Sequence, residues 1–272
     1  MIAFAPCKIN IGLQVTAKRT DGYHELSSVF YPVPLHDIIE IVENYTSLEK
    51  CKFTSSGIQT NANNGDNLCV KAYSLLDKDF NLPPVLIHLH KQIPVGAGLG
   101  GGSSDASQVL KMLNEKFTLN LTADALLNYA TMLGSDCPFF IKSSPQIATG
   151  RGEILNDINL NLSGFYLLLV KPHIFISTKE AYSLITPSPS AFDLNRLSVT
   201  DITNWKNYVT NDFEAPLFKK YHLLKDIKNH LYQSGAVYAA MSGSGSAMFG
   251  IFESEPKTSI PFLNCNSVIK KL

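Results

Sequence analysis

The sequence has no excess of charge, because its 23 lysine and arginine residues are matched by 23 aspartate and glutamate residues. Without net charge, the composition gives no argument for a main role in binding nucleic acid or a membrane surface. Any anion-binding site must therefore be built locally. The chain also lacks a long apolar run, since its strongest, residues 165–170, is far too short to cross a membrane. The N-terminus has no long apolar stretch either, and we expect no signal peptide.

Cysteine is scarce, and its spacing excludes a disulfide framework or a zinc site of the usual kind. No two of the five cysteines are closely spaced: Cys7, Cys51, Cys69, Cys137 and Cys265. We therefore expect free thiols in a reducing compartment, which favours a cytoplasmic protein. Nothing in the sequence indicates the oligomeric state.

Strand and helix patterns are both present but do not alternate strictly. We expect strands at residues 9–15, 29–33, 38–42, 85–90, 165–170, 236–241 and 247–252. Helical spacing and capping signals predict helices at 67–77, 106–117, 122–133 and 216–231, and a polar loop at 54–67. This mixture predicts an α+β fold with two lobes and a boundary near residue 150.

The most informative segment is PVGAGLGGGSSDAS, residues 94–107, which has five glycines between Gly96 and Gly102. Glycine allows positive φ and close approach of the backbone, so successive N–H groups can surround an anion. The amphipathic helix expected to follow adds unpaired N–H groups and its positive dipole end. Ser103 and Ser104 supply hydroxyls at the same place. The segment predicts a phosphate site that needs no basic side chain.

Three other nucleotide-binding motifs do not fit this segment. A dinucleotide fold needs a second strand with an acidic end about twenty residues on, but residues 121–133 have a helical pattern. A Walker loop ends in glycine-lysine-serine or threonine, and no lysine occurs between Lys91 and Lys111. A protein kinase needs H-R-D and D-F-G motifs, and neither is present. A flexible linker is also disfavoured, because a patterned helix follows at once. These exclusions leave a phosphate site of another kind at the start of a helix.

Three segments in this order resemble the GHMP kinase family: residues 3–15 (AFAPCKINIGLQV), the glycine-rich segment, and the late SGSGS turn at 242–246. The strings PCKIN (6–10), RTDGYH (19–24) and GSDCPFF (134–140) are similar to one branch of the family, whose substrate carries a cytidine diphosphate group. Cys137 departs from the small aliphatic residue that is common there.

The resemblance implies a two-lobed GHMP kinase-like fold with mixed β-sheets and packed helices, and an active site in the cleft between the lobes. It implies an N-terminal ATP-binding domain at 1–149, which contains the glycine-rich phosphate loop, and a C-terminal substrate-side domain at 150–272.

The implied reaction transfers the γ-phosphoryl group of ATP to the 2-hydroxyl of a methylerythritol moiety, in the non-mevalonate route to isoprenoid precursors. Mg²⁺ is expected with ATP. Two alternatives stay open: a GHMP kinase for a sugar, homoserine or mevalonate, and a binding module without catalytic activity. The presence of both Lys8 and Asp136 argues against the second alternative.

The resemblance assigns the catalytic roles to these two residues. Asp136 would accept the hydroxyl proton, and Lys8 would stabilise both this carboxylate and the developing negative charge. From sequence alone, a helix cap is the favoured role for Asp136, and an exposed strand position is the default for Lys8; the matched GSDCP context favours catalysis for Asp136.

The same resemblance places the binding residues. Tyr23 would stack on the cytosine ring and His24 would pair with its edge, with core packing or turn formation as the alternatives for the aromatic, glycine and asparagine residues. The residues implied for ATP binding are Pro94, Val95, Gly96, Ala97, Gly98, Leu99, Gly100, Gly101, Gly102, Ser103, Ser104 and Asn67. Those implied for the substrate are Asn10, Tyr23, His24, Thr178, Tyr182, Gly243 and Gly245. For the metal, the one candidate ligand is Ser104.

Overall fold

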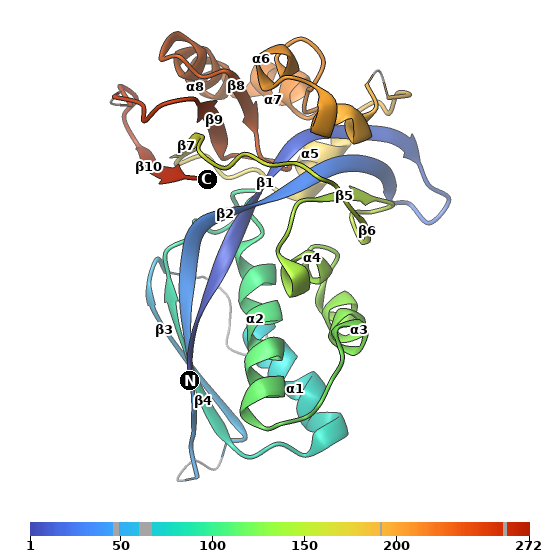
Figure 1. Cartoon of the computed structure of the whole chain (residues 1–272), viewed down its shortest axis with the longest axis vertical. Helices are drawn as coiled ribbons and strands as arrows, with labels where there is room; N and C mark the ends of the chain where they lie inside the picture. Colours follow the sequence, from blue (N-terminus) through green and yellow to red (C-terminus); the bar gives the residue numbers. More distant parts are fainter. Residues whose placement is uncertain (46–48, 60–66, 191, 258–259) are drawn as a thin grey trace. The chain divides into compact units, whose positions relative to one another are not determined.

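The computed structural model describes residues 1–272 except 46–48, 60–66, 191 and 258–259 (Figure 1). Its strands are β1 (Ile2–Lys18), β2 (His24–Glu43), β3 (Cys51–Gly57), β4 (Val85–Lys91), β5 (Gln146–Thr149), β6 (Ile154–Asp157), β7 (Tyr166–Pro172), β8 (Tyr238–Met241), β9 (Met248–Phe252) and β10 (Cys265–Lys271). Its helices are α1 (Leu68–Phe80), α2 (Gly101–Lys116), α3 (Ala123–Leu133), α4 (Cys137–Lys142), α5 (Thr178–Ser183), the 3₁₀ helix η2 (Leu194–Val199), α6 (Ile202–Trp205), α7 (Glu214–Lys220) and α8 (His222–Gln233). The expected α+β class is confirmed.

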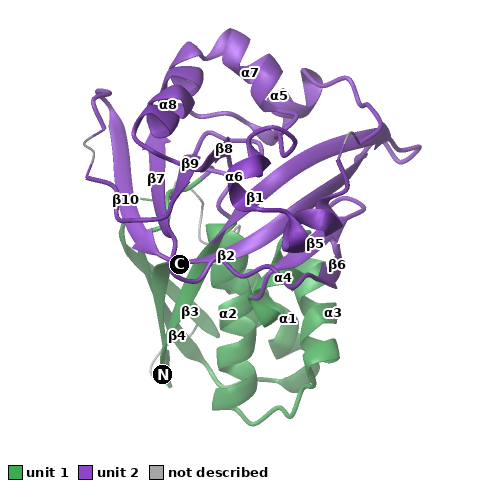
Figure 2. Cartoon of the chain, turned by 45° about the horizontal axis from the view of Figure 1, so that its top comes forward, with its two compact units in different colours: residues 1–7, 35–95, 100–143 green, residues 8–34, 96–99, 144–272 purple. Residues whose placement is uncertain are grey.

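The chain forms two compact units, coloured green and purple in Figure 2. Unit 1 contains residues 1–7, 35–95 and 100–143, and unit 2 contains residues 8–34, 96–99 and 144–272. Strands β1 and β2 thus contribute to both units. The units interleave along the chain, whereas the sequence-based domains 1–149 and 150–272 are consecutive, and that domain division stays a prediction.

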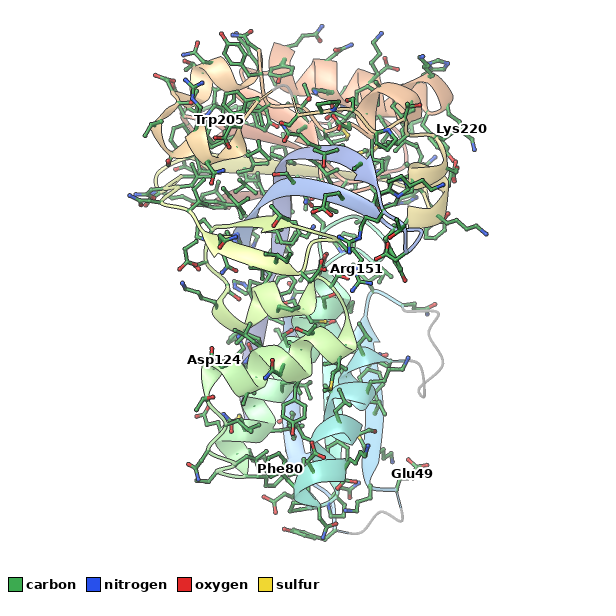
Figure 3. All side chains as sticks on the ribbon, turned by 90° about the vertical axis from the view of Figure 1, so that its right-hand side faces the viewer. Glu49, Phe80, Asp124, Arg151, Trp205 and Lys220 are labelled. Atoms are coloured by element: carbon green, nitrogen blue, oxygen red, sulfur yellow. The ribbon has the colours of Figure 1, made fainter. Side chains whose placement is uncertain are left out.

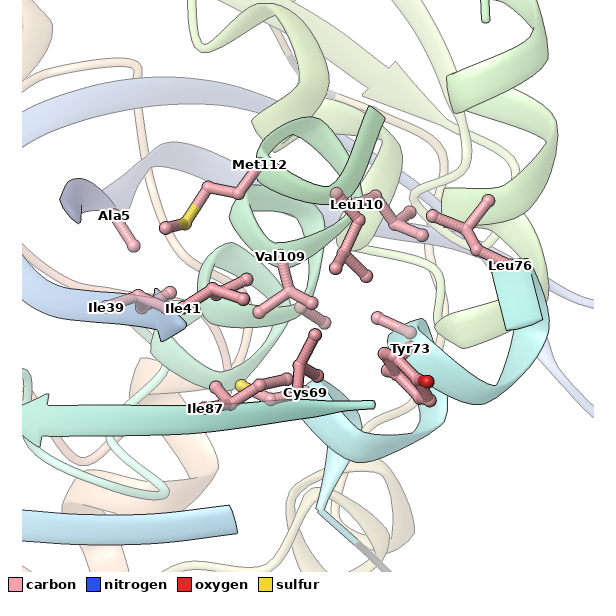
Figure 4. Close-up of a cluster of buried hydrophobic side chains, with 14 of the residues drawn as sticks. Ala5, Ile39, Ile41, Cys69, Tyr73, Leu76, Ile87, Val109, Leu110 and Met112 are labelled. Carbon is pink, nitrogen blue, oxygen red and sulfur yellow. The ribbon is translucent and has the colours of Figure 1, made fainter. Parts of the chain in front are cut away.

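Unit 1 packs helices on one face of a sheet. Strand β4 pairs antiparallel with the second half of β2 and parallel with β3. The core joins Ile39, Ile41 and Ile87 of these strands to apolar side chains of α1 and α2, as Figure 4 shows. Val109 and Leu110, which the helical spacing placed on the buried face of α2, are both fully buried.

Unit 2 contains a four-stranded antiparallel sheet in the order β10-β7-β9-β8. Its core joins Leu168 and Val170 of β7 to Leu224, Ile227 and Leu231 of α8. Strand β2 also continues its sheet in unit 2, where its first half pairs with β5, and β5 pairs with β6.

Some local predictions need correction. The single helix expected at 216–231 is two helices, α7 and α8, because Tyr221 leaves the helical region at φ −119° and ψ 77° and its hydroxyl donates to Glu180 Oε1 at 2.8 Å. The two strands expected within 29–42 are one strand, β2. Of the loop expected at 54–67, residues 54–57 belong to β3, and residues 60–66 lie outside the described residues.

Two composition-based expectations can be compared with the structure. All five cysteines carry free thiols. Over the ranges given above, no helix combines the length and the apolar character that crossing a bilayer requires.

Candidate functional site

The glycine-rich loop between β4 and α2 adopts a backbone that most residues avoid. Gly96, Gly98 and Gly100 have φ of +60°, +78° and +69°, the region where a Cβ is strained. The alternating residues Ala97 and Leu99 are buried. The loop is therefore held by its apolar side chains, while Gly96 is exposed and Gly98 and Gly100 are partly exposed.

In unit 2 the loop lies against the SGSGS turn that links β8 to β9. Ser242 Oγ donates to Gly98 O at 2.9 Å, and Ala247 N donates to Ala97 O at 3.2 Å. A Cβ on Gly98 would lie 2.0 Å from Ser242 O. Only glycine fits at position 98, so the two glycine-containing segments that the sequence singled out lie directly side by side.

Lys8 and Asn10 on β1 join the same group of contacts. The Lys8 backbone N–H donates to Leu99 O at 3.0 Å, and its ammonium donates to Asn10 Oδ1. Asn10 N donates to Ser242 Oγ at 3.2 Å, and Asn10 Nδ2 donates to Ser28 Oγ at 2.8 Å. The Lys8 residue is 3% exposed, so the alternative of an exposed strand lysine is wrong.

The N-terminus of α2, in unit 1, is not capped by a side chain. Gly100 is the N-cap residue and makes no side-chain capping bond, so the first N–H groups of a 16-residue helix are left for another acceptor. Ser104 Oγ is buried in this first turn and, across the part of the chain that the structure describes, has no hydrogen-bond partner. A Cβ on Gly101 would lie 2.9 Å from Ile93 Cγ2, so a larger residue would push the helix start away.

A buried group of three charged side chains links the start of α2 to β2 and to the end of β4. Lys91 Nζ donates to Asp37 Oδ2 and, at 2.7 Å, to Asp105 Oδ2 of α2. The other oxygen of Asp37 accepts from Gln92 N at 2.6 Å and Ile93 N at 2.8 Å. Burial raises the pKa of Asp105 to about 8 despite the opposing effect of Lys91. We call these residues the Lys91 triad.

Asp136 is the residue before α4, and its side chain makes no capping bond to that helix. The cap alternative is therefore not supported. The first residue of α4 is tied to α2, because Ser107 Oγ of α2 donates to Cys137 O at 2.8 Å. Burial raises the pKa of Cys137 to about 11, in keeping with an unreactive buried thiol. The pairing of Asp136, in unit 1, with Lys8, in unit 2, stays a prediction.

The aromatic residues implied for substrate binding lie in unit 2. His24 stacks on Tyr182 with ring centroids 4.8 Å apart, and Tyr182 meets Phe213 edge to face at 4.9 Å. Tyr23 is 56% exposed, and the Arg151 guanidinium lies over its ring at 4.8 Å. Arg151, labelled in Figure 3, is in the turn between β5 and β6. No motif in the sequence points to Arg151, because it is an isolated arginine.

The remaining predicted residues are placed as follows. Thr178 is the first residue of α5, the helix that also carries Tyr182. Asn67 caps α1, accepting from Cys69 N at 2.8 Å, so its turn role is confirmed while its role at adenine stays a prediction. Gly243 and Gly245 have φ of +57° and +90°, as tight turns require.

Family comparison finds two matches along the chain. The family described as GHMP kinases N terminal domain matches residues 67–144, which include the glycine-rich loop and Asp136. The family described as GHMP kinases C terminal matches residues 194–259, which include the SGSGS turn.

Similar proteins carry a more specific name. A protein of Bacteroides fragilis named 4-diphosphocytidyl-2-C-methyl-D-erythritol kinase is 49% identical over 257 residues, which span 94% of each chain. A crystal structure of 4-(cytidine 5'-diphospho)-2C-methyl-D-erythritol kinase is 33% identical, covers 92% of this chain and 90% of its own, and has a TM-score of 0.77. The mevalonate kinase of Methanococcus jannaschii is 16% identical, with 93% and 90% of the two chains covered and a TM-score of 0.69, which shows a shared fold alone.

Proposed function

This chain belongs to the GHMP kinase family, and we propose that it is the member that phosphorylates the 2-hydroxyl of 4-diphosphocytidyl-2-C-methyl-D-erythritol with ATP. The observation that carries the proposal is the glycine loop of residues 96–100, which turns through three glycines at positive φ and is held by hydrogen bonds from Ser242 and Lys8. The names of the relatives indicate the identity of the substrate, and they favour the cytidyl alcohol over a sugar, homoserine or mevalonate.

The phosphate chain of ATP binds, in this proposal, to backbone N–H groups of residues 94–102 and to the uncapped first turn of α2. Ser103 and Ser104 add hydroxyls. Because this attraction comes from the backbone, the chain needs no cluster of basic side chains, which agrees with its neutral composition.

The substrate hydroxyl oxygen forms a bond to the γ-phosphorus, and the bond from that phosphorus to the departing ADP oxygen breaks. Asp136 accepts the hydroxyl proton as the new bond forms. Lys8, buried and held by Asn10, supplies a fixed positive charge that stabilises the negative charge on the transferring group.

The cytidine group is recognised through Tyr23 and His24 in this proposal. Tyr23 has an exposed ring face for stacking, and His24 is held in place by its contact with Tyr182. The half-exposed Tyr23 carries little of the core, which supports a binding role over a packing role.

Mg²⁺ bound with ATP would screen the phosphate charges and favour departure of ADP. The buried, unpartnered Ser104 Oγ is an oxygen donor of the kind that Mg²⁺ accepts. Within the described ranges no cluster of three or more His, Cys, Asp or Glu side chains could hold a metal by itself. We therefore propose that Mg²⁺ arrives with the nucleotide and takes Ser104 as a protein ligand. The five free thiols support a reducing, cytoplasmic location.

An ADP-release assay tests the proposal. Purified protein with MgATP is given the cytidyl substrate, mevalonate or homoserine in parallel, and we expect ADP release to depend on the cytidyl substrate. Release with mevalonate or homoserine alone would identify a different kinase of the family. Tight MgATP binding with no release for any alcohol would indicate a binding module.

A further inference from the structure

Residues 211–214 contact the SGSGS turn and the end of β8, but no motif in the sequence singled them out. Asn211 is 2% exposed and uses both ends of its amide. Its Nδ2 donates to Met241 O and to Gly243 O, each at 2.8 Å, and its Oδ1 accepts from Phe213 N at 3.0 Å. One buried side chain thus holds the last residue of β8 and the second residue of the turn.

The two residues around Phe213 fix this segment on both sides. Asp212 Oδ2 accepts from Val15 N at 2.7 Å, on β1. Glu214 is also buried, accepts from Met241 N at 2.8 Å and pairs with Lys228. Asn211 is therefore anchored independently of the turn, and it can impose a position on the turn rather than follow it.

The turn that Asn211 holds is in contact with two predicted site residues, Gly98 and Asn10. Ser242 Oγ donates to Gly98 O and accepts from Asn10 N. The side chain of Asn10 in turn accepts a hydrogen bond from the Lys8 ammonium at Oδ1. A Cβ on Gly243 would lie 3.2 Å from Gly98 Cα and 3.3 Å from Asn10 Oδ1. Gly243 thus has little room for a side chain beside Gly98 and Asn10. A shift of the turn would therefore either break the two hydrogen bonds of Ser242 Oγ or move Gly98 and Asn10 with it.

We infer that Asn211 is a positioning residue for phosphoryl transfer, which acts by holding the Ser242–Ser246 turn against the phosphate loop and against Asn10. It touches neither nucleotide nor alcohol in this account. The inference rests on the proposed function, because that proposal places ATP at the loop that contains Gly98, and the family resemblance implies substrate contacts for Asn10 and Gly243.

The test replaces Asn211 with aspartate, which keeps the shape but sets an oxygen against two carbonyl oxygens. The matched control is Asn207→Asp, the same chemical change at an exposed position of unit 2. Steady-state constants are measured well below the unfolding temperature and scaled to the folded fraction. We expect kcat/KM of Asn211→Asp to fall about 10-fold or more relative to the control, with both kcat and KM for the alcohol affected. A purely structural role would lower the unfolding temperature and leave these constants within about twofold, and that result would overturn the inference.

Two further measurements keep the test decisive. If Asn211→Asp does not fold, Ser242→Ala removes the hydroxyl that joins the turn to Gly98 and Asn10, and the same loss is expected; wild-type constants would overturn the inference. If the wild type releases no ADP with the cytidyl alcohol, the proposed function has failed, but the inference is still decided by calorimetric MgADP affinity. That affinity should be weaker in Asn211→Asp than in Asn207→Asp, and equal affinities would refute the positioning role.

Discussion

The Lys91 triad places two carboxylates around one ammonium in the interior of unit 1, and this imbalance has a measurable consequence. Burial raises the pKa of Asp105 to about 8, whereas an aspartate in an unfolded chain has a pKa near 3.9. One oxygen of Asp105 has no hydrogen-bond partner in the part of the chain that is described, which further disfavours the ionised form. At neutral pH we therefore expect the folded protein to hold a proton that the unfolded chain has released.

The sign of the effect follows from this difference in bound protons. Since the folded-state pKa is the higher one, the contribution to stability is complete below about pH 4 and is lost as pH rises towards 8. One proton corresponds to about 1.4 kcal/mol per pH unit, so the free energy of unfolding should fall by about 2 kcal/mol between pH 6 and pH 8 and level off above that.

The perturbation is Asp105→Asn, which preserves the shape, keeps an oxygen for Lys91 and cannot ionise. Urea unfolding of the wild type and the variant at pH 6, 7, 8 and 9 gives the assay, and Asp226→Asn on the exposed side of α8 controls for the loss of one surface charge. The stability of Asp105→Asn relative to the wild type should rise by about 2 kcal/mol from pH 6 to pH 8. A difference that stays constant across this range would show that Asp105 is ionised in the folded protein.

Three further outcomes are expected. Asp136→Ala should lower kcat about 100-fold to 10,000-fold through loss of the proton acceptor, while calorimetric MgADP affinity stays near the wild-type value; unchanged turnover would remove Asp136 from the mechanism. Gly98→Ala should destabilise by about 3 kcal/mol or more in thermal unfolding and weaken MgADP, because its Cβ would overlap Ser242 O at 2.0 Å. The control Gly164→Ala, at φ +94° in open space, should cost about 1 kcal/mol, and equal losses would contradict the overlap argument. Tyr23→Ala should raise KM for the cytidyl substrate about 10-fold at constant KM for ATP and constant unfolding temperature, and a change in both KM values would argue against base stacking.

Elements stabilised by their own periodic pattern could be predicted from the sequence. Helix α2 follows from the spacing of Val109, Leu110 and Leu113, and α3 from Thr122, which caps it by accepting from Ala125 N at 3.2 Å. The glycine loop could be found because it needs residues without a side chain at alternating positions, Gly96, Gly98 and Gly100.

The elements that depend on distant contacts could not be predicted. The break between α7 and α8 occurs at Tyr221, whose hydroxyl bonds to Glu180 forty-one residues away. The polar residues 54–57 are the start of the segment whose composition predicted a loop, yet pairing with β4 makes them the second half of strand β3. Tertiary pairing overrides local propensity in both cases.

The residues that hold the candidate site are harder to find than those that face the ligand, for a physical reason. A loop that presents its N–H groups to an anion still needs donors for its own carbonyls. Here they come from Ser242, Ala247 and Lys8, and Lys8 lies more than 230 positions before the other two along the chain. The donors on Lys8 and Ala247 are backbone N–H groups, which every residue except proline has, so their sequence does not mark them as donors. Gly98 and Gly243 show a pattern only because each leaves space for the other's backbone. The two glycine-rich motifs are therefore halves of one packed structure, and the polar residues behind them, Asn211 foremost, keep those halves in contact.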